Sequence, residues 1–137
     1  MGVEECKTIQ LPTVTHPQGD LAFAEGGNHI PFPIARVFYV YGVPAEAARG
    51  GHAHRTLEQV VFCLTGRMEM VVDDGRRKLT ATLDDPRRGI YLPPLVWHDI
   101  GGFSSGTVYL ALTSAEFDEG DYIRDHTAFL QQVRAAV

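Results

Sequence analysis

The chain has 137 residues, of which 45% are hydrophobic and 21% charged, and it carries a formal charge of -5 from 12 basic and 17 acidic side chains. This acidic balance argues against a general nucleic-acid binder, because such a protein needs a concentrated positive field. The sequence has no apolar run of about 18 residues that could span a bilayer and no apolar signal segment near its charged N-terminus, so we expect a soluble, cytoplasmic protein with no membrane partner.

Short apolar runs separated by Gly, Pro or Asp fill the chain from about residue 9 to residue 113, a rhythm typical of all-β proteins. The expected strands, in chain order, are Val37 to Val43, Glu58 to Leu64, Met68 to Val72, Lys78 to Leu83, Gly89 to Leu92 and Thr107 to Thr113. Asp73-Asp74-Gly75 joins the third and fourth runs, and Asp-Gly is a favoured hairpin pair. The length fits a single domain spanning residues 1–137.

Near the C-terminus the apolar spacing changes to three, four and seven residues, which predicts a helix over about residues 121–135. Its apolar face would be formed by Tyr122, His126, Phe129, Leu130 and Val133. Asp118, Glu119 and Asp121 precede this face and suit the positive end of a helix dipole.

The run around Gln59 is apolar on both faces, with Val61 and Cys63 on one and Val60 and Phe62 on the other. One face can fill a barrel, and the other needs a second sheet or another subunit to cover it, which makes a homodimer plausible. Cys63 is expected to be a buried thiol, not part of a disulfide with Cys6.

His52 and His54 stand two positions apart, so on a strand both imidazoles project from the same face and can meet one ligand. Two histidines are a poor choice for an ordinary core, because each needs hydrogen-bond partners. The simplest structural explanation of the histidine pair is a solvated strand edge. The functional explanation is a reactive site.

The order His52-Ala53-His54, then Gln59, Gly66, Pro93 and His98, resembles the cupin pattern, which implies a jelly-roll β-barrel. In metal-binding cupins three histidines and a glutamate hold a divalent ion. Counting back from Gly66, the acidic ligand's position is filled here by Gln59, and Glu58 should face away. A neutral amide is the weaker ligand, so a tightly held catalytic metal is less favoured.

Four blocks carry a more specific resemblance: His52-Ala53-His54-Arg55-x-Leu57-Glu58-Gln59, Asp73-Asp74-Gly75, Trp97-His98-Asp99 and Phe117-Asp118-Glu119-x-Asp121-Tyr122-Ile123-Arg124. In this order they resemble the dTDP-4-keto-6-deoxyglucose 3,4-ketoisomerases, over about residues 15–130. The resemblance implies an isomerase without metal or other cofactor, acting as a homodimer with exchanged N-terminal strands. It also implies a role in making 3-amino-3,6-dideoxyhexoses for bacterial surface glycans, such as lipopolysaccharide or S-layer glycans, or for natural products.

By the same resemblance, His52 would carry a proton between sugar carbons and His54 would serve the oxygens. Imidazole suits both tasks, because its ordinary pKa of about 6.5 lies near neutrality. Gln59 and His98 would orient the sugar or the histidine tautomers. Arg36 and Arg49 would bind the diphosphate of the dTDP-linked sugar, since a guanidinium holds phosphate oxygens in a two-pronged geometry.

Tyr39 is a further candidate for substrate binding, through stacking on thymine or a hydrogen bond to the sugar. The same residues also allow two other functions. The first is a metal-dependent cupin enzyme with His52, His54, Gln59 and His98 as ligands, and the second is a cupin that only binds a sugar or nucleotide.

Overall fold

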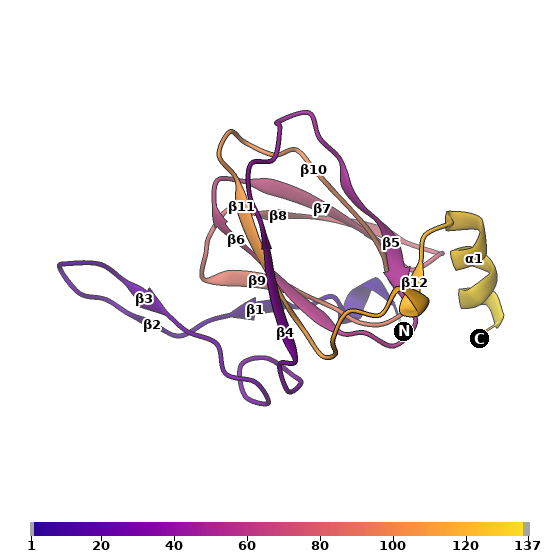
Figure 1. Cartoon of the computed structure of the whole chain (residues 1–137), viewed down its shortest axis with the longest axis horizontal. Coiled ribbons are helices and arrows are strands. Elements are labelled where there is room, and N and C mark those ends of the chain that lie inside the picture. The colour runs from indigo at the N-terminus through magenta and orange to yellow at the C-terminus, as the bar shows by residue number, and fades with distance from the viewer. Residues whose placement is uncertain (1, 136–137) are drawn as a thin grey trace.

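The computed structural model describes residues 2–135, which form two five-stranded antiparallel sheets facing each other (Figure 1). The first sheet has the order β1 (Thr8–Gln10), β9 (Arg88–Leu92), β6 (Gln59–Thr65), β11 (Val108–Thr113) and β4 (Arg36–Val40). The second has the order β12 (Tyr122–Ile123), β5 (Arg49–His54), β10 (Trp97–Gly101), β7 (Met68–Asp73) and β8 (Lys78–Leu83). The predicted all-β barrel with one C-terminal helix is therefore confirmed.

The six predicted strands all occur, with ends shifted by no more than three residues. The predicted hairpin joins β7 to β8, and its turn is fixed where the Gly75 amide donates to Oδ1 of Asp73 at 2.8 Å. Gly75 has a φ of +92°, a conformation that disfavours residues with a Cβ atom. The Asp-Gly pair thus specifies this turn.

The C-terminal helix starts later than predicted. Residues Glu119–Asp121 form a 3-10 turn, η2, and Tyr122–Ile123 form β12, so that α1 spans only His126–Ala135. Asp118 accepts a hydrogen bond from the Gly120 amide of η2, whereas the side chain of Asp125 accepts from the Ala128 amide in α1. Asp118 therefore caps η2 and not α1, and Tyr122 belongs to a sheet.

The two faces of β6 are covered by different parts of the chain, as its apolar pattern requires. Val61 and Cys63 point between the sheets and pack with buried Met68 and Met70. On the outer face, Val60 and Phe62 pack against a cluster supplied mainly by the N-terminal segment, namely Leu11, Ile30 and Phe32. Cys6 and Cys63 are both free thiols, as expected.

A short hairpin of β2 (Thr13–Val14) and β3 (Leu21–Ala22) extends away from the two sheets (Figure 1). Its apolar side chains Val14 and Leu21 are each 56% exposed. We call this segment, residues 13–22, the N-terminal arm. Within the described part of the chain, no helix has both the length and the apolar character needed to cross a membrane.

Candidate active site

Neighbouring strands of the second sheet bring His52, His54 and His98 together. His52 and His54 lie on the same face of β5, and His98 of β10 pairs directly with His52 in the antiparallel register. The register shifts by one residue at this point, so that Gly50 pairs with Asp99 and Gly51 is the extra residue of a bulge. Bulges of this kind re-aim the side chains beside them.

The bulge needs glycine. Gly50 and Gly51 have φ angles of +79° and +73°, and a Cβ atom on Gly50 would lie 2.8 Å from the carbonyl oxygen of His98. Any other residue at position 50 would push β10 away from β5. The sequence Gly50-Gly51 before His52 therefore permits the close approach of the two histidine-bearing strands.

The three imidazoles form one compact cluster. The ring of His52 lies 5.0 Å from that of His54 and 4.6 Å from that of His98, both in edge-on geometry. His54 and His98 are nearly fully buried, at 5% and 4% exposure. The Nδ1 atoms of all three rings are buried without a hydrogen-bond partner within residues 2–135. Unpaired buried polar atoms are costly, which indicates a site kept for function.

Gln59 lies opposite the histidines, on β6 of the first sheet, with only 4% exposure. Its Nε2 atom is 3.5 Å from Nε2 of His98. Glu58, one residue earlier, points the other way and accepts a hydrogen bond from the Tyr91 hydroxyl at 2.7 Å. The prediction that Gln59 and not Glu58 faces the histidines is confirmed.

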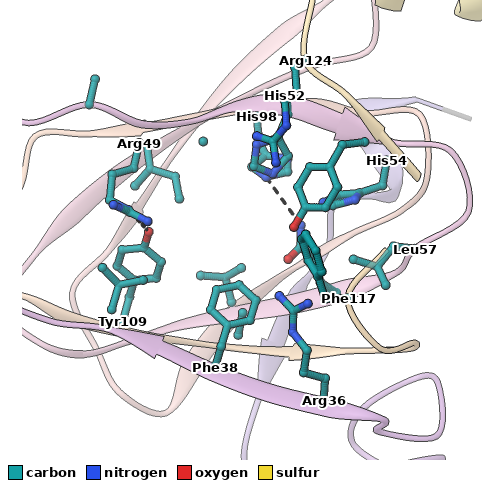
Figure 2. A pocket seen from close by; sticks show the side chains of 18 residues that line it. Arg36, Phe38, Arg49, His52, His54, Leu57, His98, Tyr109, Phe117 and Arg124 are labelled. Atoms are coloured by element: carbon teal, nitrogen blue, oxygen red, sulfur yellow. Dashed lines mark hydrogen bonds between the residues drawn. The ribbon is translucent and has the colours of Figure 1, made fainter. Parts of the chain in front are cut away.

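These side chains line a cavity of about 590 Å³ between the sheets (Figure 2). Apolar residues from both sheets complete its wall, among them Phe38, Val61, Ile100 and Ala111. The volume is in the range of small-molecule sites, and the combination of apolar wall and few polar groups is typical of them.

Two arginines predicted to bind substrate lie at different sides of this cavity (Figure 2). Arg36 stands beside the aromatic rings of Phe38 and Phe117, with its guanidinium carbon 4.7 Å and 5.5 Å from their centroids. Arg49 instead donates from Nε to the Tyr109 hydroxyl at 2.9 Å. No carboxylate within residues 2–135 pairs with either guanidinium, so both can meet an anion.

Burial lowers the pKa of each imidazole in the cluster. For His54 burial is the largest cause and repulsion from His52 the second, and together they lower its pKa to about 4. The pKa of His52 falls for the same main reason, and that of fully buried His98 falls well below 6.5. All three rings are therefore neutral at pH 7, with one nitrogen of each able to accept a proton.

The cluster also has the donor set for a divalent transition-metal ion. One nitrogen of each imidazole lies within 4.8 Å of the other two, and small side-chain shifts would bring them to the separations found around one ion. Neutral imidazoles are good ligands for such ions. His52, His54 and His98 could hold the metal, with Gln59 beside them.

Tyr39 is not brought to the cavity. It alternates with Phe38 and Val40 on β4, which line the cavity, and it projects from the outer face with 62% exposure. Its prediction as a substrate-binding residue of this site does not agree with this geometry. Tyr39 points outward because successive side chains of a strand alternate between its two faces.

Several residues that line the cavity were not predicted as site residues: Tyr109, Phe117, Tyr122 and Arg124. The Tyr122 ring packs against both His52 and His54, at 4.9 Å and 4.4 Å between centroids. Arg124 lies over Tyr122 and is held by Glu119, with Nε 2.7 Å from Oε2. Assigning Tyr122 to a helix hid this pair, whereas the alternation Tyr122-Ile123-Arg124 would have placed both side chains on one strand face.

Comparison with known proteins identifies similar sequences over almost the whole chain. The family model described as "FdtA: WxcM-like, C-terminal" matches residues 4–134. A curated TDP-4-oxo-6-deoxy-alpha-D-glucose-3,4-oxoisomerase from Aneurinibacillus thermoaerophilus is 40% identical over 129 residues, covering 94% of this chain and 93% of that protein.

Solved structures of similar proteins also match almost the whole chain. The 3,4-ketoisomerase QdtA from Thermoanaerobacterium thermosaccharolyticum, a histidine-to-asparagine mutant in complex with TDP-4-keto-6-deoxyglucose, is 33% identical with a TM-score of 0.93, covering 96% of this chain and 95% of that one. The WlaRB TDP-quinovose 3,4-ketoisomerase from Campylobacter jejuni is 32% identical with a TM-score of 0.90, covering 93% and 98%.

Proposed function

The chain belongs to the FdtA (WxcM-like, C-terminal) family of dTDP-sugar 3,4-ketoisomerases, and from this membership we propose that its histidine-lined cavity isomerises dTDP-4-keto-6-deoxyglucose to a dTDP-3-keto-6-deoxyhexose. The observation that carries the proposal is the cluster of three buried imidazoles in one cavity, in a chain that is 40% identical to a curated oxoisomerase of this kind.

The reaction needs only proton transfers. A base removes the proton from C3 while the C4 oxygen gains one, which gives an enediol. C4 then gains a proton and the C3 hydroxyl loses one, leaving a carbonyl at C3 and a hydroxyl at C4. No electrons leave the sugar, so one acid-base group for the carbons and one for the oxygens suffice.

We assign these two tasks to His52 and His54. His52 is the less buried of the two and lies between His54, His98 and Tyr122, where it can reach a sugar in the cavity and carry the proton between C3 and C4. His54 lies deeper and serves the oxygens. Gln59 on the opposite wall and His98 beside His52 orient the hydroxyl groups.

The diphosphate of the substrate belongs at the side of the cavity where Arg36 lies. Arg36 stands there next to the aromatic rings, and Arg124 lines the same cavity. The diphosphate brings about two negative charges, which favour the protonated form of imidazoles close to it.

The proposal includes a homodimer with exchanged N-terminal arms. The arm leaves its own sheets with Val14 and Leu21 exposed, and the outer face of the first sheet exposes Val37 and Tyr39 at 54% and 62%. The exposed apolar side chains of the arm and those of the sheet face in the same chain are complementary surfaces for a second copy. Light scattering at micromolar concentration should give twice the chain mass of 15.1 kDa, and a monomer would contradict this part.

The direct test is proton NMR of dTDP-4-keto-6-deoxyglucose mixed with the chelator-treated protein. A new 3-keto sugar nucleotide supports the proposal, and the coupling constants at C4 give the configuration of the product. An unchanged substrate would contradict it.

A metal-dependent enzyme is the second candidate, favoured by the mutual approach of the His52, His54 and His98 nitrogens. A divalent ion held there would polarise a substrate oxygen. Activity that disappears with the chelator and returns with added Zn²⁺, Mn²⁺ or Fe²⁺ would favour this candidate.

A further inference from the structure

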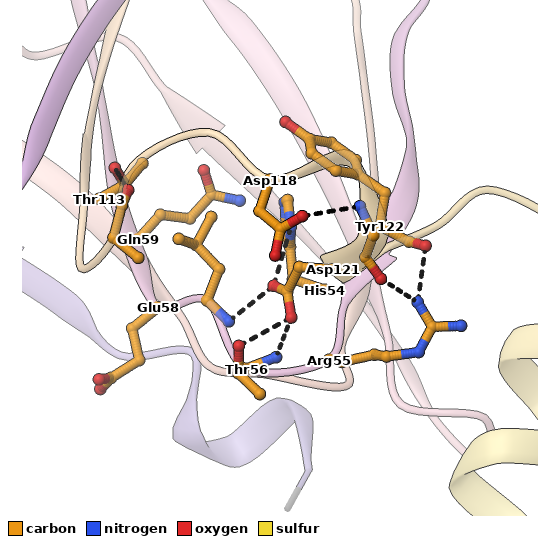
Figure 3. A network of polar contacts seen from close by, with 12 residues as sticks. His54, Arg55, Thr56, Glu58, Gln59, Thr113, Asp118, Asp121 and Tyr122 are labelled. Atoms are coloured by element: carbon orange, nitrogen blue, oxygen red, sulfur yellow. Dashed lines mark hydrogen bonds and ion pairs between the residues drawn. The ribbon is translucent and has the colours of Figure 1, made fainter.

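A carboxylate from the C-terminal segment lies beside the histidine pair. Asp121, the last residue of η2, is only 13% exposed. Its Oδ1 atom accepts hydrogen bonds from the amide and the hydroxyl of Thr56, at 2.9 Å and 2.7 Å, and its Oδ2 atom accepts from the Leu57 amide at 3.0 Å (Figure 3). Asp121 is therefore held firmly at the turn between β5 and β6.

The backbone around Asp121 is anchored to the same turn. The Arg55 amide donates to the carbonyl oxygen of Asp121 at 2.9 Å. The Arg55 guanidinium donates to the carbonyl oxygens of Gly120 and Tyr122, at 3.0 Å and 2.9 Å (Figure 3). Tyr122 then pairs with His54 in the sheet. These contacts fix the carboxylate of Asp121 relative to the ring of His54.

Near the Asp121 carboxylate, the Nδ1 atom of His54 is the polar atom that lacks a hydrogen bond. It is buried and has no hydrogen-bond partner within residues 2–135. Oδ2 of Asp121 lies 3.7 Å from it. A shift of less than about 1 Å would bring these two atoms to the length of a charge-assisted hydrogen bond.

We propose that Asp121 is the positioning residue of the catalytic pair: its carboxylate holds the proton of His54 on Nδ1 and leaves Nε2 as the nitrogen that exchanges protons with the substrate. This inference rests on the proposed function, because it assigns a role within the same acid-base chemistry.

The physical reason is the choice between two tautomers. A neutral imidazole carries its proton on either nitrogen, and the hydrogen bond made by one nitrogen decides the state of the other. A fixed carboxylate on the Nδ1 side favours Nδ1–H. It also stabilises the imidazolium that forms when Nε2 accepts a proton, which opposes the effect of burial on His54.

The experiment compares Asp121→Asn with Asp118→Asn. Asparagine keeps the shape and one acceptor of the Asp121 side chain but removes the charge. Asp118 belongs to the same segment and caps the Gly120 amide, so its replacement controls for any loss of charge near η2. For each protein, ketosugar turnover gives kcat and KM, and nitrogen-15 NMR of labelled histidine gives the tautomer of His54.

We expect Asp121→Asn to lower kcat about 10- to 100-fold with KM within about twofold, a loss typical of a misplaced acid-base group. The proton of His54 should move partly or fully to Nε2 in this variant. Asp118→Asn should match the unaltered protein in both measurements. Unchanged turnover or an unchanged tautomer in Asp121→Asn would overturn the proposal.

The unaltered protein provides a test that does not depend on a variant folding. Its His54 should carry the proton on Nδ1, and a proton on Nε2 would by itself overturn the role of Asp121. The two proposals fail separately: absence of any ketosugar conversion by the unaltered protein removes the proposed function, whereas conversion with a proton on Nε2 of His54 removes only the role of Asp121.

Discussion

The space between the two sheets has a filled half and a hollow half. In the filled half, Met68, Met70 and Val96 are at most 1% exposed and belong to one hydrophobic cluster. In the hollow half, His52 and His54 leave buried nitrogen atoms unpaired around a cavity of about 590 Å³. Strands β7 and β10 are neighbours in one sheet, yet β7 supplies Met68 and Met70 to the packed cluster whereas β10 supplies His98 to the cavity.

This difference shows how the molecule separates stability from chemistry. The filled half removes apolar surface from water and thereby stabilises the fold. The hollow half gives up such packing and keeps imidazoles neutral by burial. Changes in the two halves should therefore affect different measurements, and the following predictions test that separation.

The largest effect is expected from His52→Asn, which removes the proton carrier of the hollow half. Turnover should fall by about 10³-fold or more, while dTDP affinity stays within a few fold, because the change leaves the arginines in place. Steady-state kinetics and calorimetric titration measure the two quantities. Glu58→Gln is the control and should retain turnover, because Glu58 points away from the histidines and accepts a hydrogen bond from Tyr91. Full activity of the His52 variant would contradict the mechanism.

In the filled half, Met70→Ala should act on stability instead. Met70 is fully buried, and truncation of such a side chain costs about 2–5 kcal/mol of unfolding free energy. Urea denaturation measures this loss. At 20 °C the folded fraction should keep its kcat within a few fold, and a large fall in kcat per folded molecule would mean that the two halves are not separable.

Acid should destabilise the protein through the hollow half. The folded pKa of His54 is about 4, below the ordinary value of 6.5, so the unfolded chain binds more protons between these values. Stability is therefore full above about pH 6.5 and is lost as the pH falls toward 4. His54 alone contributes about 2 kcal/mol to the loss between pH 7 and pH 5.

Urea denaturation at these two pH values checks this prediction, with His54→Gln as the control because glutamine does not titrate. The variant should lose less stability than the unaltered protein. An equal loss in both proteins would show that other groups cause the acid effect.

The smallest effect is expected at the edge of the hollow half. Arg36→Ala should weaken dTDP binding about tenfold, since a hydrogen bond to a charged group is worth about 1.5–3 kcal/mol. Arg76→Ala, an exposed arginine in the β7–β8 turn, is the matched control and should bind dTDP normally. Calorimetric titration of both variants measures the difference, and equal affinities would remove Arg36 from the nucleotide site.

Most of the strands and the histidine pair could be predicted from sequence because their patterns are local. The two-residue spacing of His52 and His54, and the Asp74-Gly75 turn, each depend on backbone geometry within a few residues. The orientation of Gln59 followed from its register on the same kind of strand. The resemblance to a known family then added His98, which is distant in sequence.

The rest of the site depends on contacts that sequence spacing does not reveal. Tyr122 fits the apolar spacing of the helix that follows it, but it pairs with His54 and is therefore a strand residue. Asp121 was expected to face a helix dipole, and instead it binds the Thr56 and Leu57 amides. Tyr39 looked suitable for a ligand, but strand alternation turns it outward.

The central claim is that the imidazoles of the hollow half move protons on the sugar. The most direct test is proton NMR in deuterated water, which follows deuterium at C3 and C4 of the ketosugar with the unaltered protein and with His52→Asn. The account predicts deuterium at these carbons with the unaltered protein and none with the variant, although the variant still binds dTDP. Deuterium incorporation at an equal rate with the variant would contradict the assignment of His52 as the group that carries the proton.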